Sequence, residues 1–215
     1  RSDWYTVLAR TGEKTLGLFS VHKHDPGISF GHRETKMGIK GSPTADVILD
    51  NCRIPEHRAI GDASKGYHYI TDSLTWTRVL IGAQALGIAQ GALDQAVKYT
   101  SEREQFGETL SRFQMIRGKI ADMATEIEAG RALLYNAAQS IDAGDPKARA
   151  LASMAKLFCS DVAMRVTTEA VQLHGGAGYL ADFPVERMMR DAKITQIYEG
   201  VNEIQRLIIA KHVYG

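Results

Sequence analysis

The chain of 215 residues has little cysteine, no long apolar run and almost no net charge. Two cysteines, Cys52 and Cys159, form neither a disulfide framework nor a metal-binding spacing, which favours a reducing compartment. The longest uncharged run, Val79 to Leu93, has 15 residues and includes two glutamines and three glycines, so a membrane-spanning role is excluded. A net charge of +1 disfavours nucleic-acid binding as the main role.

Several motifs that carry chemistry are also missing. The sequence holds no P-loop, no G-x-G-x-x-G opening a helix after a strand, and no G-x-S-x-G elbow. The close pair His22 and His24 lies in a charged, turn-like segment without the further ligands that zinc needs, so we expect no metal. The first ten residues lack a secretion signal pattern. We therefore expect a bacterial cytoplasm or a mitochondrial matrix rather than secretion.

Alanine and proline divide the chain near Gly66. Residues 1–65 hold 4 alanines and 3 of the 5 prolines, whereas residues 66–215 hold 22 alanines and 2 prolines. The first part predicts antiparallel strands, and the second predicts helices. We expect an α+β fold with a partial antiparallel β-domain at 1–65 and a helical bundle at 66–215. The expected strands cover residues 4–8, 15–21, 27–30 and 45–49.

Apolar residues at spacings of three and four predict the helices of the second part. The first begins at Gly66 and ends near Glu104, with Gly107 as its stop. The others are expected at 113–141, 147–173, 184–194 and 201–212. Because long helices joined by short connections pack against each other, this pattern favours an antiparallel bundle.

Two features admit both a structural and a phosphate-binding interpretation. The string Gly175-Gly176-Ala177-Gly178 either ends a helix or lets the backbone approach a flat or phosphorylated ligand closely. Arg103 either complements the dipole at a helix C-terminus or offers a fork of donors to phosphate oxygens. The residues alone leave both questions open.

Glu199 likewise admits a structural and a catalytic interpretation. It stands beside Gly200 between two apolar helical segments. One interpretation is a carboxylate near the start of the last helix, where it interacts favourably with the dipole. The other is a general base in an apolar pocket, where desolvation disfavours the charged form and promotes proton uptake.

Taken in order, a set of strings across the whole chain resembles the acyl-CoA dehydrogenase family. The strings are Trp4-Tyr5, Pro26-Gly27-Ile28, and those at residues 37–42, 103–107, 172–179, 184–194 and 196–206. The resemblance implies FAD-dependent oxidation of an acyl-CoA thioester to the trans-2-enoyl-CoA. It implies that Glu199 takes the α proton while the β hydrogen leaves as hydride to the flavin, and that the Glu199 backbone N–H helps to stabilise the thioester oxygen.

The resemblance also implies which residues contact the substrate. Some members carry the base on the residue before a substrate-binding arginine, which corresponds here to Thr77 before Arg78. Because Thr77 carries no carboxylate, Glu199 is left as the candidate base. Thr75 replaces an aspartate of many members, which alters the local hydrogen bonding. The implied substrate contacts are Thr75, Arg78, Tyr198 and Gly200.

Two further sets correspond to cofactor-binding positions of the family. One set reaches the ADP half of the FAD of a neighbouring subunit: Arg103, Gln105, Phe106, Gln114, Gln172, Leu173, His174, Gly175 and Gly176. The other lies on the flavin side of its own subunit: Val201, Asn202 and Glu203. Val201 replaces a common threonine, so we expect altered FAD contact there. The implied partners are acyl-CoA, an electron-transfer flavoprotein as electron acceptor, and copies of the chain in a homotetramer or homodimer.

The length departs from the family pattern. Members carry a helical domain and the first half of the β-domain before the point at which this sequence starts. We therefore expect a fragment, a partially sequenced chain or one part of a split enzyme, with an apolar face open to interaction. The alternatives that remain are a non-catalytic helical interaction module and an acyl-CoA oxidase.

Overall fold

The computed structural model describes residues 2–215, which form two compact units. The first comprises Arg1–Lys36, described from Ser2, and Lys40–Leu74. The second comprises Met37–Ile39 and Thr75–Gly215. The units divide inside a long helix, and the domain boundary expected at residues 65 and 66 stays a prediction.

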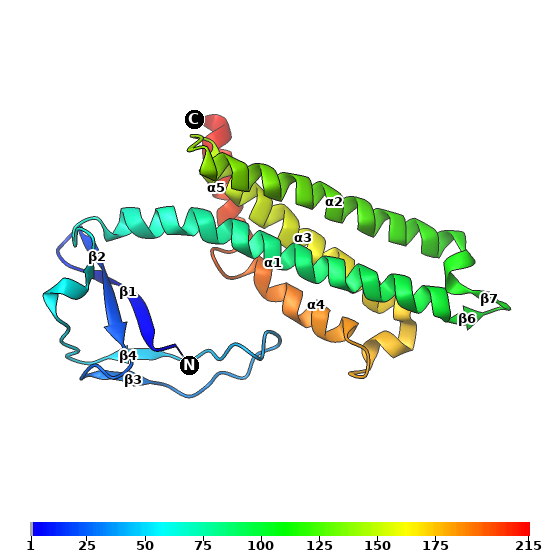
Figure 1. Ribbon diagram of the computed structural model, residues 1–215, viewed down its shortest axis with the longest axis horizontal. Helices are drawn as coiled ribbons and strands as arrows, with labels where there is room; N and C mark the ends of the chain where they lie inside the picture. Colours follow the sequence, from blue (N-terminus) through cyan, green and yellow to red (C-terminus); the bar gives the residue numbers. More distant parts are fainter. Residues whose placement is uncertain (1) are drawn as a thin grey trace. The chain divides into compact units, whose positions relative to one another are not determined.

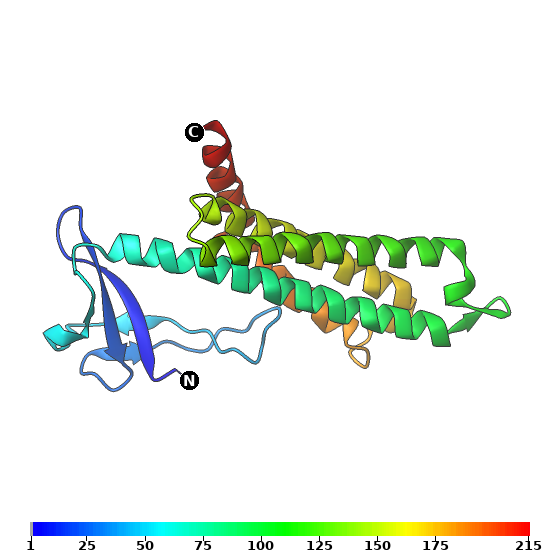
Figure 2. The same cartoon turned by 45° about the horizontal axis from the view of Figure 1, so that its top comes forward.

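The first unit is built from short antiparallel strands, as the strand-like runs predict. A three-stranded sheet has the order β1-β2-β5, and β3 pairs with β4 in a separate ribbon. The strands are β1 (Trp4–Arg10), β2 (Leu16–His22), β3 (Ile28–Phe30), β4 (Val47–Leu49) and β5 (Ala59–Ile60), and η1 (Glu56–Arg58) precedes β5. The register pairs Trp4 with His22 and Arg10 with Leu16, and Figure 2 shows β1 and β2 as a twisted ribbon.

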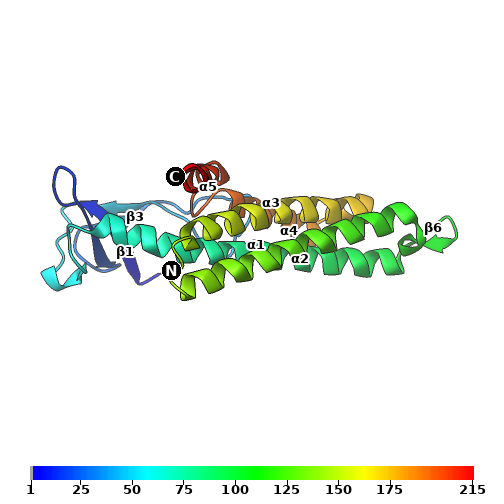
Figure 3. The same ribbon diagram turned by 90° about the horizontal axis from the view of Figure 1, so that it is seen from above.

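The second unit contains the helices, and the predicted helical segments are confirmed to within a few residues. Its elements are α1 (Gly66–Glu102, from Thr75 onwards), β6 (Glu104–Gln105), β7 (Glu108–Thr109), η2 (Leu110–Arg112), α2 (Gln114–Asp142), α3 (Ala148–His174), η3 (Gly175–Tyr179), α4 (Val185–Lys193), η4 (Ile194–Gln196) and α5 (Asn202–Tyr214). The chain runs along α1, returns along α2 and runs forward again along α3, which gives an antiparallel bundle (Figure 1, Figure 3).

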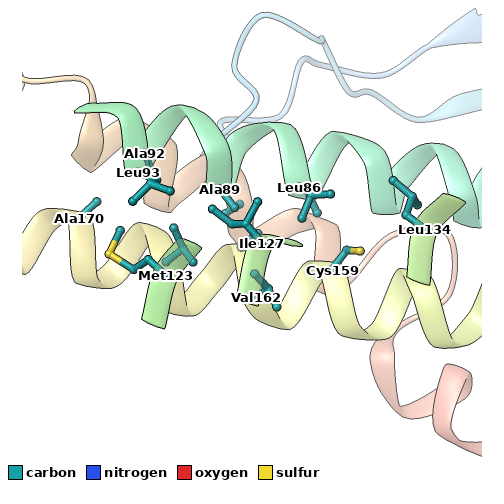
Figure 4. Close-up of a cluster of buried hydrophobic side chains, with 14 of the residues drawn as sticks. Leu86, Ala89, Ala92, Leu93, Met123, Ile127, Leu134, Cys159, Val162 and Ala170 are labelled. Atoms are coloured by element: carbon teal, nitrogen blue, oxygen red, sulfur yellow. The ribbon is translucent and has the colours of Figure 1, made fainter. Parts of the chain in front are cut away.

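Small side chains let the three long helices pack closely. Ala85, Ala89 and Ala92 of α1 are fully buried and belong to one apolar cluster with Ile127 of α2 and Val162 of α3. Figure 4 shows Ala89 beside Ile127. Full burial of a side chain such as Ile127 or Val162 contributes roughly 1.5–3 kcal/mol to the free energy of unfolding. The cluster therefore fixes the positions of the helices that carry the candidate site residues.

The prediction that Gly107 ends the first long helix is wrong. α1 ends at Glu102, and Phe106 and Gly107 form the turn of the β6–β7 hairpin, with φ of +58° and +82°. A two-residue turn with positive φ at both central positions matches the twist of the flanking strands. Glycine adopts this conformation freely, but phenylalanine does so only at a steric cost.

A loop segment joins the helical unit through α4. The Ile39 backbone N–H donates to the Asp191 carboxylate at 2.6 Å, and the Arg190 guanidinium donates to the Met37 carbonyl at 2.7 Å. A Cβ at Gly38 would lie 2.5 Å from the Arg190 carbonyl oxygen, so only glycine fits between these contacts. These contacts explain why Met37–Ile39 groups with the helices.

Candidate functional site

Glu199 lies in a short connection between η4 and α5. Its φ is +56°, and that of Gly200 is +90°. A left-handed conformation costs a glutamate on the order of 1–3 kcal/mol, so its surroundings have to hold it in place. Such strain is typical of residues whose exact direction matters for function.

The Glu199 carboxylate is half-buried and points toward α1. The Thr77 hydroxyl donates a hydrogen bond of 2.8 Å to Oε2 of Glu199. Arg78, the next residue of α1, is only 5% exposed and interacts electrostatically with Glu199. The structure therefore brings Glu199, Thr77 and Arg78 together. The roles of Glu199 as base and of Arg78 as substrate contact stay predictions.

Arg78 is a buried cation with unused donors. Burial lowers the pKa of its guanidinium, and the nearby charge of Arg149 lowers it further, while Glu199 acts in the opposite direction. Among residues 2–215, Nε and Nη1 of Arg78 have no hydrogen-bond partner. Because leaving a buried donor unpaired costs about 1–3 kcal/mol, a ligand acceptor at this position would be stabilised.

Tyr198 links the same connection to α1. Its hydroxyl donates to the side-chain oxygen of Gln84, and burial raises the pKa of the phenol. Tyr198 is therefore neutral at physiological pH. Its hydrogen bond to Gln84 attaches the residue that precedes Glu199 to α1. Thr75, the other predicted substrate contact, is half-buried one turn before Arg78.

Beneath the connection lies a polar network that sequence reasoning missed. Lys156 of α3 is fully buried, and its ammonium donates to the Gly200 carbonyl at 2.9 Å and to Oδ1 of Asn202 at 2.8 Å. Asn202 in turn donates to the Ser160 hydroxyl at 2.9 Å and to the Asp161 carboxylate at 2.8 Å. The Asn202 side chain is thus engaged inside the chain, which leaves exposed Val201 and Glu203 as the predicted flavin-side groups.

Gln205 completes the network from α5. Its side-chain amide donates to the Gly200 carbonyl at 2.9 Å and to the Glu199 carbonyl at 3.3 Å. The available signal for this network was a single basic residue, Lys156, in the otherwise uncharged run between Arg149 and Asp161. A buried lysine in such a run needs hydrogen-bond acceptors, and the connection supplies them.

A groove of about 500 Å³ lies near the hairpin end of the bundle. Four residues predicted to bind cofactor line it: Phe106, Gln114, Gln172 and Leu173. The remainder of its lining comes from Leu110, Phe113, Met115, Ile116 and Lys119. Arg103 and Gln105 are exposed in the adjoining hairpin segment. The structure therefore gathers side chains from the hairpin, α2 and the end of α3.

Gly175 and Gly176 leave open space beside the backbone after α3. Both are exposed, and a Cβ at either position would meet nothing within 4 Å among the described residues. At Gly176 the chain's own packing therefore does not exclude a side chain, whereas at Gly175 a φ of +59° favours glycine. This open backbone is suited to a close ligand approach.

His174 differs from its predicted neighbours because its ring belongs to the core. The side chain is 4% exposed, stacks on Tyr99 at 4.3 Å between ring centroids, and shares a hydrogen bond of 2.7 Å between Nδ1 and the Ala170 carbonyl. Burial lowers the pKa of the imidazole. A cofactor contact of His174 is therefore left to its backbone.

Membrane-spanning helices and metal-binding clusters are absent from the described residues 2–215. No helix there is long and apolar enough to span a bilayer. No group of three or more His, Cys, Asp or Glu side chains there is placed to hold a metal ion.

Comparison with known proteins places the chain in a family. The model of the acyl-CoA dehydrogenase C-terminal domain matches residues 64–214. A protein of Mycobacterium tuberculosis named Probable acyl-CoA dehydrogenase FadE25 is 53% identical over 98% of this chain and 55% of its own length. The structure of butyryl-CoA dehydrogenase from Megasphaera elsdenii superposes with a TM-score of 0.97 at 43% identity, covering 100% of this chain and 57% of that one.

A second solved structure is equally similar. A chain from work on the electron transferring flavoprotein of Acidaminococcus fermentans has a TM-score of 0.97 and 46% identity, covering 99% of this chain and 57% of that one. The chain thus spans about half the length of the relatives it matches. On the family model and these identities together, the chain belongs to the acyl-CoA dehydrogenase family of oxidoreductases and corresponds to its C-terminal part.

Proposed function

We propose that this chain supplies the catalytic base and one side of the substrate site of an FAD-dependent acyl-CoA dehydrogenase. The observation that carries the proposal is the Glu199 carboxylate, which is half-buried, held by the Thr77 hydroxyl and adjacent to the buried Arg78. A carboxylate in this setting is positioned by the protein and partly shielded from water. Both properties favour proton transfer to it from a bound carbon acid.

In the proposed reaction Glu199 removes the α proton of the acyl-CoA thioester. The Thr77 hydroxyl donates to Oε2 of Glu199 and thereby orients the carboxylate for proton uptake. The electron pair of the broken Cα–H bond forms the Cα=Cβ bond as a hydride leaves the β carbon. FAD, when bound, supplies the acceptor of that hydride.

The α proton becomes acidic enough only if the thioester oxygen is stabilised as negative charge develops on it. The Glu199 backbone N–H makes no backbone hydrogen bond within residues 2–215 and is a donor for this oxygen. Glu199 carries both the backbone N–H and the carboxylate. Its left-handed conformation therefore sets the directions of both groups at once. The strained conformation of Glu199 thus positions the carboxylate as base and the backbone N–H as donor to the developing oxyanion.

The groove at the hairpin end fits the ADP half of FAD by its chemistry. It offers the amide groups of Gln114 and Gln172 and the exposed Phe106 ring. The open backbone of Gly175 and Gly176 follows Leu173, which lines the groove, in the sequence. About 38 Å of helix separate Thr77 from Glu102 at 1.5 Å per residue, too far for one dinucleotide to reach both ends. The groove therefore serves a cofactor held by a neighbouring copy, which supports a homodimer or homotetramer.

An electron-transfer flavoprotein is the proposed electron acceptor. The support is the similarity to a chain from a structure of such a flavoprotein system. Measurement of hydrogen peroxide during turnover in air distinguishes this acceptor from oxygen. Peroxide formed in step with substrate oxidation contradicts the proposed acceptor and supports an acyl-CoA oxidase.

The base assignment is tested by Glu199→Gln in the protein expressed from its complete gene. The substitution keeps the size of the side chain and an oxygen for the Thr77 hydrogen bond but removes the basic carboxylate. We expect the rate of flavin reduction by acyl-CoA to fall by roughly 10²–10⁴-fold, with FAD content and melting temperature preserved. Glu128→Gln, at an exposed carboxylate of α2, is the matched control. Unchanged reduction by the Glu199 variant contradicts the proposal.

A further inference from the structure

Lys156 is a buried cation, and it is not among the residues that the family resemblance assigns to the substrate or the cofactor. Its side chain is fully buried in α3, where an ammonium is costly unless its protons are paired. Neither of its two hydrogen bonds goes to a carboxylate, since the acceptors are the Gly200 carbonyl and the Asn202 side-chain amide oxygen. Both acceptors belong to the segment that follows Glu199. The buried charge is therefore directed at the connection that carries the proposed base.

The Gly200 carbonyl is held from two helices at once. Lys156 reaches it from α3 at 2.9 Å, and Gln205 reaches it from α5 at 2.9 Å. A carbonyl oxygen has two lone pairs, so these two donors satisfy it. Gln205 also donates to the Glu199 carbonyl at 3.3 Å, which places a donor on each peptide that flanks Gly200.

The backbone at this point needs such restraint. Glu199 has a φ of +56°, which an unrestrained glutamate rarely adopts. Rotation of the Glu199–Gly200 segment toward ordinary backbone angles would turn the side chain away from Thr77 and change the direction of the Glu199 N–H. A misplacement on the order of 1 Å of a reacting group costs up to about 10²-fold in rate.

We propose that Lys156 is a positioning residue for proton abstraction, because its hydrogen bonds to Gly200 and Asn202 hold the Glu199 segment in its strained conformation. Gln205 has the same role from α5. The inference rests on the proposed function of Glu199. Charged groups around the ammonium come from three elements besides the Glu199 segment itself: Asp161 of α3, Glu203 of α5 and Arg78 of α1.

The test compares Lys156→Met with Val166→Ala in the FAD-loaded protein expressed from its complete gene. Methionine keeps much of the length of the side chain but cannot donate, whereas Val166 is a fully buried residue of α3 in the apolar core. We expect Lys156→Met to lower kcat for flavin reduction by about 10²-fold with KM changed by less than about threefold. Val166→Ala lowers the melting temperature but keeps kcat.

A loss of stability alone would leave kcat per FAD-loaded molecule unchanged, so the kcat and KM values separate positioning from folding. If Lys156→Met is folded and its kcat equals that of Val166→Ala, the inference is overturned. If Lys156→Met does not fold, Gln205→Met decides by the same criterion, because it removes both amide hydrogen bonds to the segment. Glu199→Gln in the same assay identifies failure of the proposed function, since retained activity there counts against Glu199 and not against Lys156 alone.

Discussion

Because the ammonium of Lys156 is buried, we expect its contribution to the free energy of unfolding to increase at alkaline pH. Burial lowers the pKa of Lys156 from 10.5 to about 8, although the nearby carboxylates of Asp161 and Glu203 oppose the shift. Below pH 8 both the folded and the unfolded chain hold the proton. Between pH 8 and pH 10.5 the unfolded chain binds more protons than the folded chain. The contribution of Lys156 to the free energy of unfolding therefore rises with pH across this window.

The size of the effect follows from the shift of the pKa. At 1.36 kcal/mol per pKa unit, the contribution rises by about 2–3 kcal/mol between pH 7 and pH 10, with about half of the rise reached by pH 9. Other groups titrate over the same range. The quantity to compare is therefore the difference in free energy of unfolding between the unsubstituted protein and Lys156→Met, in which contributions from unchanged groups cancel.

Urea unfolding followed by helical circular dichroism at pH 7, 8, 9 and 10 measures this difference. We expect it to shift in favour of the unsubstituted protein as the pH rises. Lys98→Met, at an exposed lysine of α1, is the control for removal of a lysine charge. A flat difference for Lys156→Met, or one that falls with pH, refutes the account of a buried and desolvated ammonium.

Three further predictions concern other parts of the chain. Gly38→Ala should lower the free energy of unfolding by about 1–3 kcal/mol in urea unfolding, because its Cβ would lie 2.5 Å from the Arg190 carbonyl oxygen. Gly41→Ala, with nothing within 4 Å of its Cβ, should change it little. Burial lowers the pKa of His174 below 6.5, so the unfolded state binds more protons there, and unfolding curves should show stability falling as the pH drops below 6.5. Replacement of His174 by Gln should remove that dependence. Phe106→Ala should speed the dissociation of FAD, measured by fluorescence. The melting temperature should not change, because the Phe106 side chain is 94% exposed in the described chain. An unchanged dissociation rate contradicts the proposed cofactor contact of Phe106.

The sequence predicts most of the helical unit because its signals there are local. Apolar spacing identifies the helices, and the segment Gly144-Asp145-Pro146 separates α2 from α3. The hairpin at Phe106 was not predictable from propensity, since phenylalanine in a left-handed turn contradicts its usual preference. A glycine after a helical run reads equally well as a helix stop or as the second residue of such a turn.

Some residues of the candidate site are predictable from the sequence and others are not. Glu199 and Arg78 are predicted through the resemblance, Glu199 within the string at residues 196–206 and Arg78 as the counterpart of a substrate-binding arginine. Lys156 and Gln205 were missed because their role depends on contacts across helices that are far apart in the sequence. His174 lies in the predicted cofactor stretch, yet its ring is buried against Tyr99. Side-chain direction is set by packing, which a sequence string does not contain.

The proposed base, Glu199, is expected to exchange a proton with the α carbon of a bound acyl-CoA. The direct measurement is mass spectrometry of acyl-CoA recovered after incubation in D₂O with anaerobic protein whose flavin is already reduced, so that net oxidation is blocked. We predict deuterium at the α carbon with the unsubstituted protein and with Glu128→Gln, and none above background with Glu199→Gln. Equal α-deuterium incorporation by Glu199→Gln would contradict the account.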